Sequence, residues 1–313
     1  MKNSNDVSDY DLFDYDYSTY WRNREYESMA EKYLLDNIFD RKKGIWFLDI
    51  GGSYGRLAAT YCSQYSNPII LDYSLKTLQK NKDFIKAKFP DIELIAGNVY
   101  KMPFRDNVFD GAMMVRVLHH IENTDDCFCE VNRVMDNNSV YIQEFANKMH
   151  IKAVIRALLH FNFKFFNKAP YEHPLSNSKA EGTSDGLKGI FYNFHPAYVK
   201  ESLRRYGFEV KKKYGCSFLR IPILKKLLSE DIILFFEKIF QKILSWTNIA
   251  PSLFYVSTTK KDTDEKFNED IKEILVCPEC KGELIFETSE SCICKKCKKK
   301  YKKEDDIWDF RVL

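Results

Sequence analysis

The sequence lacks any uninterrupted apolar run of about 18 residues, the length that a helix needs to cross a bilayer. Its first residues, MKNSNDVSDYDLFDYDYS, mix acidic and aromatic side chains and contain no apolar core like that of a secretory signal peptide. Net charge is also nearly absent, because 48 Lys and Arg residues face 45 Asp and Glu residues and leave +3. These absences predict a cytoplasmic protein, and the charge balance argues neither for nor against a nucleic-acid partner.

One glycine-rich stretch stands out in what the sequence does contain. Residues 46–57 read WFLDIGGSYGRL, an apolar run that ends in an acid, three glycines within five positions, and a return to apolar residues. The pattern predicts a buried strand, a tight turn and the start of a helix, with the backbone of the turn close to a bound nucleotide. A dinucleotide fingerprint, G-x-G-x-x-G, is excluded because its third and sixth positions are Ser53 and Arg56.

Further apolar runs predict more strands. They lie at residues 68–72, 92–96, 109–115, 140–145, 208–214 and 253–258, and helical patterns such as residues 126–135 and 197–206 separate them. Strands that alternate with helices indicate an α/β fold with a parallel sheet, whose ligands lie outside the carboxyl ends of the strands. The residues that this rule gathers around one crevice are Asp49, Asp72, Asn98, Val115, Arg116 and residues 144–147.

In their order along the chain, these pieces resemble class I S-adenosylmethionine (SAM) methyltransferases of the type 11 form. Residues 49–55 are similar to the family motif D-x-G-x-G-x-G with Ser53 at the central glycine, and residues 109–121 to its fourth strand and LHH continuation. The resemblance implies a Rossmann-like sheet and SAM as methyl donor, with Asp72 accepting both ribose hydroxyls and Asn98 facing the adenine amine. The cofactor-binding residues that we expect are Asp49, Gly51, Gly52, Ser53, Gly55, Asp72, Tyr73, Asn98, Val99, Val115 and Arg116.

The general base is left unassigned. Methyl transfer from a sulfonium requires alignment of donor and acceptor and exclusion of water, with no covalent residue. His119 is a candidate for catalysis, although a histidine pair at a helix start is more often structural, and His195 is a candidate that can instead cap a helix. Arg116 can bind the SAM carboxylate or an anionic substrate, or it can form a salt bridge inside the fold.

The length suits one large domain and one small domain. Apolar spacing of three and four over residues 20–38 predicts a helix that packs on the core. In related methyltransferases such a helix covers the cofactor, so Tyr20, Trp21 and Arg24 are candidates for contact with SAM or substrate, with plain packing as the alternative. The expected domains are a helical cap over 1–44, the methyltransferase domain over 45–260 with insertions near 147–192 and 217–250, a linker over 261–272, and a small domain over 273–313.

Both insertions bear on the substrate. Residues 147–192 contain an amphipathic basic helix over 151–166, at the crevice end of the fifth strand where substrate contacts are usual. Residues 218–246 form an apolar helical pair that either meets a membrane or a greasy substrate, or covers the sheet or an oligomer interface. We favour the covering role, because Glu230, Asp231 and Glu237 dilute the basic face that a membrane helix needs.

Five of the nine cysteines lie in the last 40 residues, which indicates a metal site rather than a disulfide framework. Cys277, Cys280, Cys294 and Cys297 form a C-x2-C…C-x2-C pattern that predicts a structural zinc site, with Cys292 as a spare thiol. The lysines over residues 295–300 either offset the negative thiolate centre or bind RNA.

Residues 274–310 resemble the small zinc-ribbon activator proteins that partner RNA, tRNA and protein methyltransferases. The ribbon therefore predicts a protein or RNA contact and an RNA or protein acceptor. The LHH form is instead similar to small-molecule enzymes, including the quinone-pathway type, and the N-P-P-Y motif of enzymes that methylate planar amino nitrogens is replaced by residues 115–118, VRVL. A small or lipid-like acceptor is slightly favoured. A non-catalytic, partner-binding scaffold is the alternative of another class, and the oligomeric state is left open.

Overall fold

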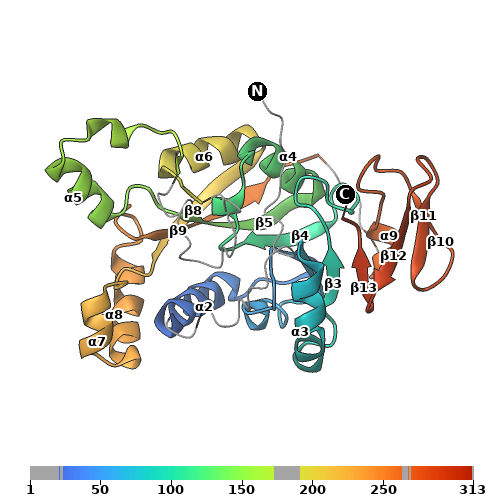
Figure 1. Ribbon diagram of the computed structural model, residues 1–313, viewed down its shortest axis with the longest axis horizontal. Helices are drawn as coiled ribbons and strands as arrows, with labels where there is room; N and C mark the ends of the chain where they lie inside the picture. The colour runs from blue at the N-terminus through green and yellow to red at the C-terminus, as the bar shows by residue number, and fades with distance from the viewer. Residues whose placement is uncertain (1–20, 22–23, 173–190, 263–266, 268, 312–313) are drawn as a thin grey trace, which may run out of the picture.

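The computed structural model describes residues 21, 24–172, 191–262, 267 and 269–311, and an 11-stranded sheet runs through its centre (Figure 1). The strand order is β10-β11-β12-β13-β3-β2-β1-β4-β5-β9-β8. The strands from β3 to β5 in this order are parallel, which confirms the predicted α/β fold. Their bounds are β1 (Gly44–Ile50), β2 (Tyr65–Asp72), β3 (Glu93–Ala96), β4 (Phe109–Met114) and β5 (Met135–Ala146).

Helices cover both faces of this sheet. Figure 1 shows α4 (Thr124–Val134) and α6 (Pro196–Arg205) on one face and α2 (Glu25–Phe39) and α3 (Leu75–Lys88) on the other. Successive side chains of β1 point to opposite faces of the sheet, which explains the two layers. Trp46, Leu48 and Ile50 join the apolar core beneath α4 and α6. Phe47 joins the core beneath α2 and α3.

Two antiparallel strands complete one end of the sheet. They are β8 (Phe208–Cys216) and β9 (Ser252–Thr259), and β9 lies between β5 and β8. The register pairs Ala146 with Ser252 and Ser252 with Cys216. The segment after β5 and the segment between β8 and β9 therefore both leave the sheet at its carboxyl edge, where β1, β2 and β4 also end.

These two segments carry the remaining helices. The first contains α5 (Ile151–Leu159), the short 3-10 helix η4 (Phe163–Phe166) and the two-stranded ribbon of β6 (Tyr171–Glu172) and β7 (Tyr192–Asn193). The second contains α7 (Pro222–Leu227) and α8 (Glu230–Ile243), as the apolar pair predicts. No helix in the described part of the chain is both long enough and apolar enough to span a membrane.

Two expected helices differ from the structure. The helix start predicted after the glycine loop is wrong, since only the 3-10 turn η2 (Ala58–Thr60) forms there. The loop makes turns through Gly55, whose φ is +69°, and β2 begins at Tyr65, so the segment between them holds only turns and this 3-10 helix. The helix predicted over 151–166 ends at Leu159, because Phe161 adopts a left-handed φ of 51°.

The cysteine-bearing segment extends the same sheet at its other end. It contains α9 (Ile271–Ile274), β10 (Leu284–Phe286), β11 (Ser291–Cys294), β12 (Lys300–Glu304) and β13 (Ile307–Asp309). Strand β13 pairs in parallel with β3, and the Phe310 amide donates to the Ala96 carbonyl at 2.8 Å. The buried side chains of Leu275 and Trp308 join the same apolar core as Phe104.

Candidate cofactor site and cysteine centre

The glycine loop follows β1 with an unusual backbone. Gly51, Ser53 and Gly55 all have positive φ, of 71°, 50° and 69°. A Cβ on Gly51 would collide with the Val117 side chain, and one on Gly52 would lie 2.8 Å from a carboxylate oxygen of Asp49. Glycine is therefore required at both positions, because the backbone lies directly against its neighbours.

Asp72, at the end of β2, joins this loop to the next strand end. One carboxylate oxygen accepts a hydrogen bond from the Ser53 amide at 2.9 Å, and the other accepts from the Ser74 amide at 2.9 Å. The Asp72 carbonyl accepts from the Gly97 amide at 2.9 Å, so the turn after β3 is tied to the same residue. The structure thus brings the predicted loop, Asp72 and the turn after β3 together at one edge of the sheet.

The other predicted residues of this edge have mainly local contacts. Asn98 accepts a hydrogen bond from the Tyr100 amide at 2.9 Å and shapes the turn after β3. Val99 is buried in that turn, Tyr73 is half-buried beside Asp72, and Val115 is buried at the end of β4.

Asp49 is buried behind the loop. It is 3% exposed and accepts a hydrogen bond from the Tyr61 hydroxyl at 3.0 Å. Burial raises the pKa of Asp49 to about 7, although the hydrogen bond from Tyr61 opposes this rise. Its carboxyl group therefore changes protonation state near neutral pH.

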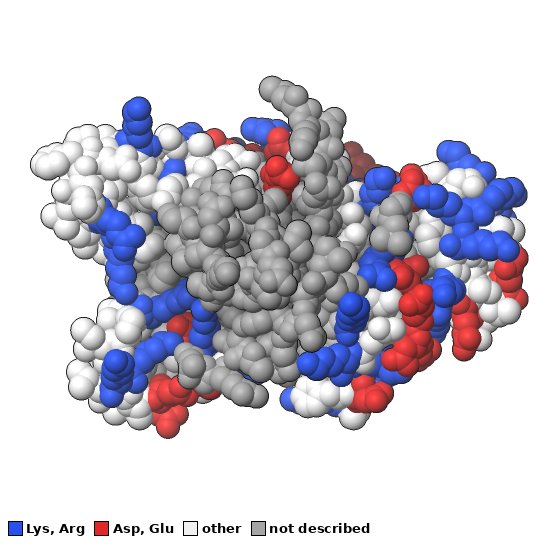
Figure 2. Space-filling model, viewed as in Figure 1, with Lys and Arg blue, Asp and Glu red and all other residues white. Residues whose placement is uncertain are grey.

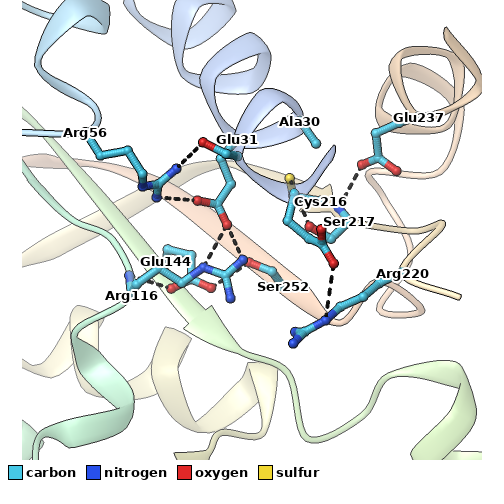
Figure 3. Close-up of polar contacts among 12 residues, drawn as sticks. Ala30, Glu31, Arg56, Arg116, Glu144, Cys216, Ser217, Arg220, Glu237 and Ser252 are labelled. Carbon is cyan, nitrogen blue, oxygen red and sulfur yellow. Dashed lines mark hydrogen bonds and ion pairs between the residues drawn. The ribbon is translucent and has the colours of Figure 1, made fainter. Parts of the chain in front are cut away.

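Arg116 belongs to a buried charge network beside the loop (Figure 3). Glu31 of α2 is fully buried and accepts hydrogen bonds from the Arg116 Nε at 2.7 Å and the Arg56 Nη2 at 2.6 Å. The Arg116 amide donates to Glu144 at the end of β5, which also accepts from Ser252 at 2.6 Å. This arrangement confirms the predicted salt bridge of Arg116 inside the fold.

The pKa values of the two acids in this network, Glu31 and Glu144, shift in opposite directions. Burial alone would raise the pKa of Glu31, but the guanidinium groups of Arg116 and Arg56 outweigh it and hold this pKa below its usual value. Burial raises the pKa of Glu144 despite the nearby Arg116. Glu31 is therefore the anion that holds both arginines at the edge of the sheet.

Sequence reasoning missed Glu31 and the position of Arg56. The signal was an acid within the apolar stripe of residues 20–38, since charged side chains are rarely buried unless they are paired. The ring of Trp21 lies over the two guanidinium groups that Glu31 binds. Its centroid is 3.8 Å from the guanidinium carbon of Arg56 and 5.7 Å from that of Arg116. Arg24 precedes α2 without a side-chain cap bond, and Tyr20 lies outside the described residues.

The two candidate histidines have structural contacts. His119 is buried in the 3-10 turn η3 (Leu118–His120), with its ring 4.3 Å from Phe191 and 4.0 Å from His120. Burial lowers its pKa well below the usual value, so the ring is neutral. His195 caps α6, because its Nδ1 accepts from the Ala197 amide at 3.1 Å. The capping interpretation of His195 is confirmed, and the catalytic one stays a prediction.

The four predicted metal ligands converge. The Sγ atoms of Cys277, Cys280, Cys294 and Cys297 all lie within 4.8 Å of one another. Two of the pairs, Cys277 with Cys297 and Cys280 with Cys294, are 3.5 Å apart. A tetrahedral zinc site with Zn–S bonds of about 2.3 Å requires sulfur atoms about 3.8 Å apart, so this donor set fits zinc.

The residues around the cysteine centre include the spare thiol, Cys292, and the lysines of residues 295–300. Cys292 is buried on β11 and is not part of the four-cysteine group. The Tyr301 hydroxyl lies 3.2 Å from the Cys277 Sγ. Two of the neighbouring lysines have carboxylate partners, since Lys295 lies 2.6 Å from Glu283 and Lys299 lies 3.6 Å from Glu279.

Comparison with known proteins gives the class of the chain. A model of the methyltransferase domain matches residues 48–142. An uncharacterized protein of Methanocaldococcus jannaschii is 28% identical over 69% of this chain and 81% of its own length. A second uncharacterized protein of that organism is 31% identical over 54% of this chain and 68% of its own length. A 24-methylenesterol C-methyltransferase of Arabidopsis thaliana is 28% identical over 36% of this chain and 32% of its own length.

Solved structures share the fold. A SAM-dependent methyltransferase from Thermotoga maritima has a TM-score of 0.52 at 12% identity and covers 80% of this chain and 98% of its own. A chain from a Haloferax volcanii complex that contains a methyltransferase activator has a TM-score of 0.51 at 13% identity, over 79% of this chain and 99% of its own. The chain belongs to the family of the second Methanocaldococcus jannaschii protein, and it contains a methyltransferase domain with the Rossmann-like fold of SAM-dependent methyltransferases.

Proposed function

We propose that the protein transfers a methyl group from SAM to a small-molecule or lipid-like acceptor. The position of Asp72 is the observation that carries the methyl-donor part of this proposal, because its carboxylate lies at the junction of the glycine loop and the end of β2. A carboxylate there is suited to accept hydrogen bonds from the hydroxyl groups of a ribose. Asn98 lies in the turn that Gly97 ties to Asp72, where an amide suits the adenine edge.

The other end of SAM is an amino acid, and its carboxylate requires a cation. Arg56 and Arg116 provide two guanidinium groups beside the loop, oriented by Glu31. The donor set of this edge therefore fits SAM from the ribose to the methionine part. When bound, SAM supplies a methyl group that its sulfonium has already activated, so these residues need only bind and orient it and exclude water.

We also infer that the four cysteines hold a structural zinc ion. All four ligand positions are taken by thiolates, which leaves no open position for a substrate. Because β13 of this segment pairs with β3, the metal would stabilise a fold that is attached directly to the methyltransferase sheet.

Calorimetric titration with SAM tests the cofactor assignment. Saturable binding supports it, whereas no binding at millimolar SAM would favour a partner-binding scaffold. Incubation with labelled SAM and fractionated cell extract then tests the acceptor. Label in lipid or small molecules is the expected result, and label in RNA or protein would instead favour a macromolecular substrate docked through the cysteine-bearing segment.

A further inference from the structure

Helix α8 packs on the protein through Ile233, Glu237 and Gln241 and exposes most of its large apolar side chains to solvent. Two of these three buried residues are therefore polar, and Ser245, just after the helix, is buried as well. Large apolar side chains on the other side are Ile232 (45% exposed), Phe235 (61%), Phe236 (44%) and Ile243 (55%), followed by Trp246 (78%). A helix that meets only water has the opposite arrangement, so the exposed side is unusual for a surface helix.

Hydrogen bonds fix this orientation. Glu237 accepts from the Tyr26 hydroxyl of α2 at 2.5 Å and from the Ser217 amide at 2.7 Å (Figure 3 includes the latter contact). The Gln241 side chain donates to the Ala30 carbonyl at 3.1 Å. Glu237 therefore faces α2, and the sequence argument that it dilutes the basic face of α8 is wrong. The covering role of α8 holds only for its buried side, which carries Ile233, Glu237 and Gln241.

The α5 segment has the same character. Residues 151–168 contain no acid, and basic residues accompany the apolar ones. The exposed apolar side chains are Ile151 (48%), Ile155 (49%), Leu158 (49%), Leu159 (73%), Phe161 (79%) and Phe163 (65%). Lys152 connects this segment to the one that leads into α7, because its Nζ donates to the Arg220 carbonyl at 3.0 Å.

Both apolar surfaces lie at the carboxyl edge of the sheet, as the pairing of Ala146, Ser252 and Cys216 requires. Figure 1 shows α5 and α7 with α8 projecting from the same end of the molecule, opposite the cysteine-bearing strands. Figure 2 shows Lys and Arg side chains beside uncharged surface on both projections. The exposed basic residues include Lys152, Arg156, Lys164, Lys226 and Lys242, while the exposed acids of α8 are Glu230 and Asp231 at its start.

We propose that α5, η4, α7 and α8 together form a docking surface for an anionic lipid bilayer. Exposed aromatic and aliphatic side chains bordered by lysine and arginine match an interface whose interior is apolar and whose surface is negative. A second copy of the chain is a poorer occupant, because a two-fold interface would place one mainly basic surface against another. Docking also brings the edge of the sheet that bears Asp72 toward the lipid. The use of this position for a lipid-like methyl acceptor is the only part of the proposal that rests on the proposed methyl transfer.

Vesicle co-sedimentation of the full chain tests the proposal. We expect the protein to sediment with vesicles of phosphatidylcholine and phosphatidylglycerol, about tenfold less with phosphatidylcholine alone, and less in high salt. Phe235→Ser should reduce binding about tenfold. Phe84→Ser is the matched control, because Phe84 is 64% exposed on α3 and should be replaceable without effect.

A second pair of variants tests the charge. Arg156→Glu should weaken binding to the anionic vesicles, while Lys302→Glu, an exposed lysine of β12, should not. Three results would overturn the proposal: no sedimentation with either vesicle, equal losses in Phe235→Ser and Phe84→Ser, or a lipid-free dimer that Phe235→Ser dissociates. SAM titration of the same preparations keeps a failure of docking distinct from a failure of the cofactor assignment.

Discussion

At the scale of single residues, the buried carboxyl of Asp49 links protonation to stability. Burial raises its folded-state pKa to about 7, from an unfolded value of about 3.9. The unfolded chain therefore loses this proton at lower pH than the folded protein does. The contribution of Asp49 to the free energy of unfolding should therefore fall as pH rises from about 4 to about 7, and then level off.

Asp49→Asn removes this titration while keeping an acceptor for Tyr61. The stability of the wild type relative to this variant should fall by on the order of 2 to 4 kcal/mol between pH 4 and pH 8. Urea unfolding across this pH range measures the difference. Parallel curves for the two proteins would show that Asp49 does not titrate in the folded state near neutral pH.

Asp72 is the residue on which the cofactor assignment can be tested most directly. Asp72→Ala should weaken SAM binding by about 1 to 3 kcal/mol, because charge-assisted hydrogen bonds to the ribose are lost. Calorimetry measures the affinity, and Asp83→Ala, an exposed acid on α3, is the control. Thermal melting of both variants separates a binding defect from the loss of the Asp72 contacts with Ser53 and Ser74, and unchanged affinity would remove Asp72 from the site.

At the scale of elements, α2 is held to the methyltransferase sheet through Glu31. Replacing Glu31 with Gln leaves two partly buried guanidinium groups without their anion, which costs at most the roughly 3 to 5 kcal/mol of a fully buried pair. We expect a clear fall in melting temperature, whereas Glu25→Gln at the exposed start of the same helix should change little. Equal melting temperatures for the two variants would mean that the network does not anchor α2.

The sequence predicts the elements of this fold better than their contacts. Strands such as β1 could be predicted because a continuous apolar run is what a strand buried on both faces requires. The partner of Glu31 could not be assigned because Arg116 lies 85 residues away, and nothing local identifies it. The side of α8 that faces the protein was equally hidden, since hydrogen bonds from Tyr26 and Ser217 decide it.

At the scale of the whole molecule, the cysteine centre supports one end of an 11-stranded sheet. Cys294→Ser should reduce the zinc content from about one ion per chain to none, because three thiolates no longer close the tetrahedral shell. Cys129→Ser is the matched control, since Cys129 is exposed and lies outside the four-cysteine group. Metal analysis of the purified proteins gives the content directly, and a wild type without zinc would reject the assignment.

Loss of the metal should also reach the methyltransferase sheet. Strand β13 covers the edge of β3, and Trp308 is only 3% exposed at this junction. Chelation should therefore expose Trp308, leave β1, β2 and β4 protected, and uncover an edge strand that promotes association between chains. Hydrogen exchange measured before and after chelation would show fast exchange over residues 273–311 and in β3. Uniform loss of protection across the sheet would mean instead that the two parts unfold as one unit.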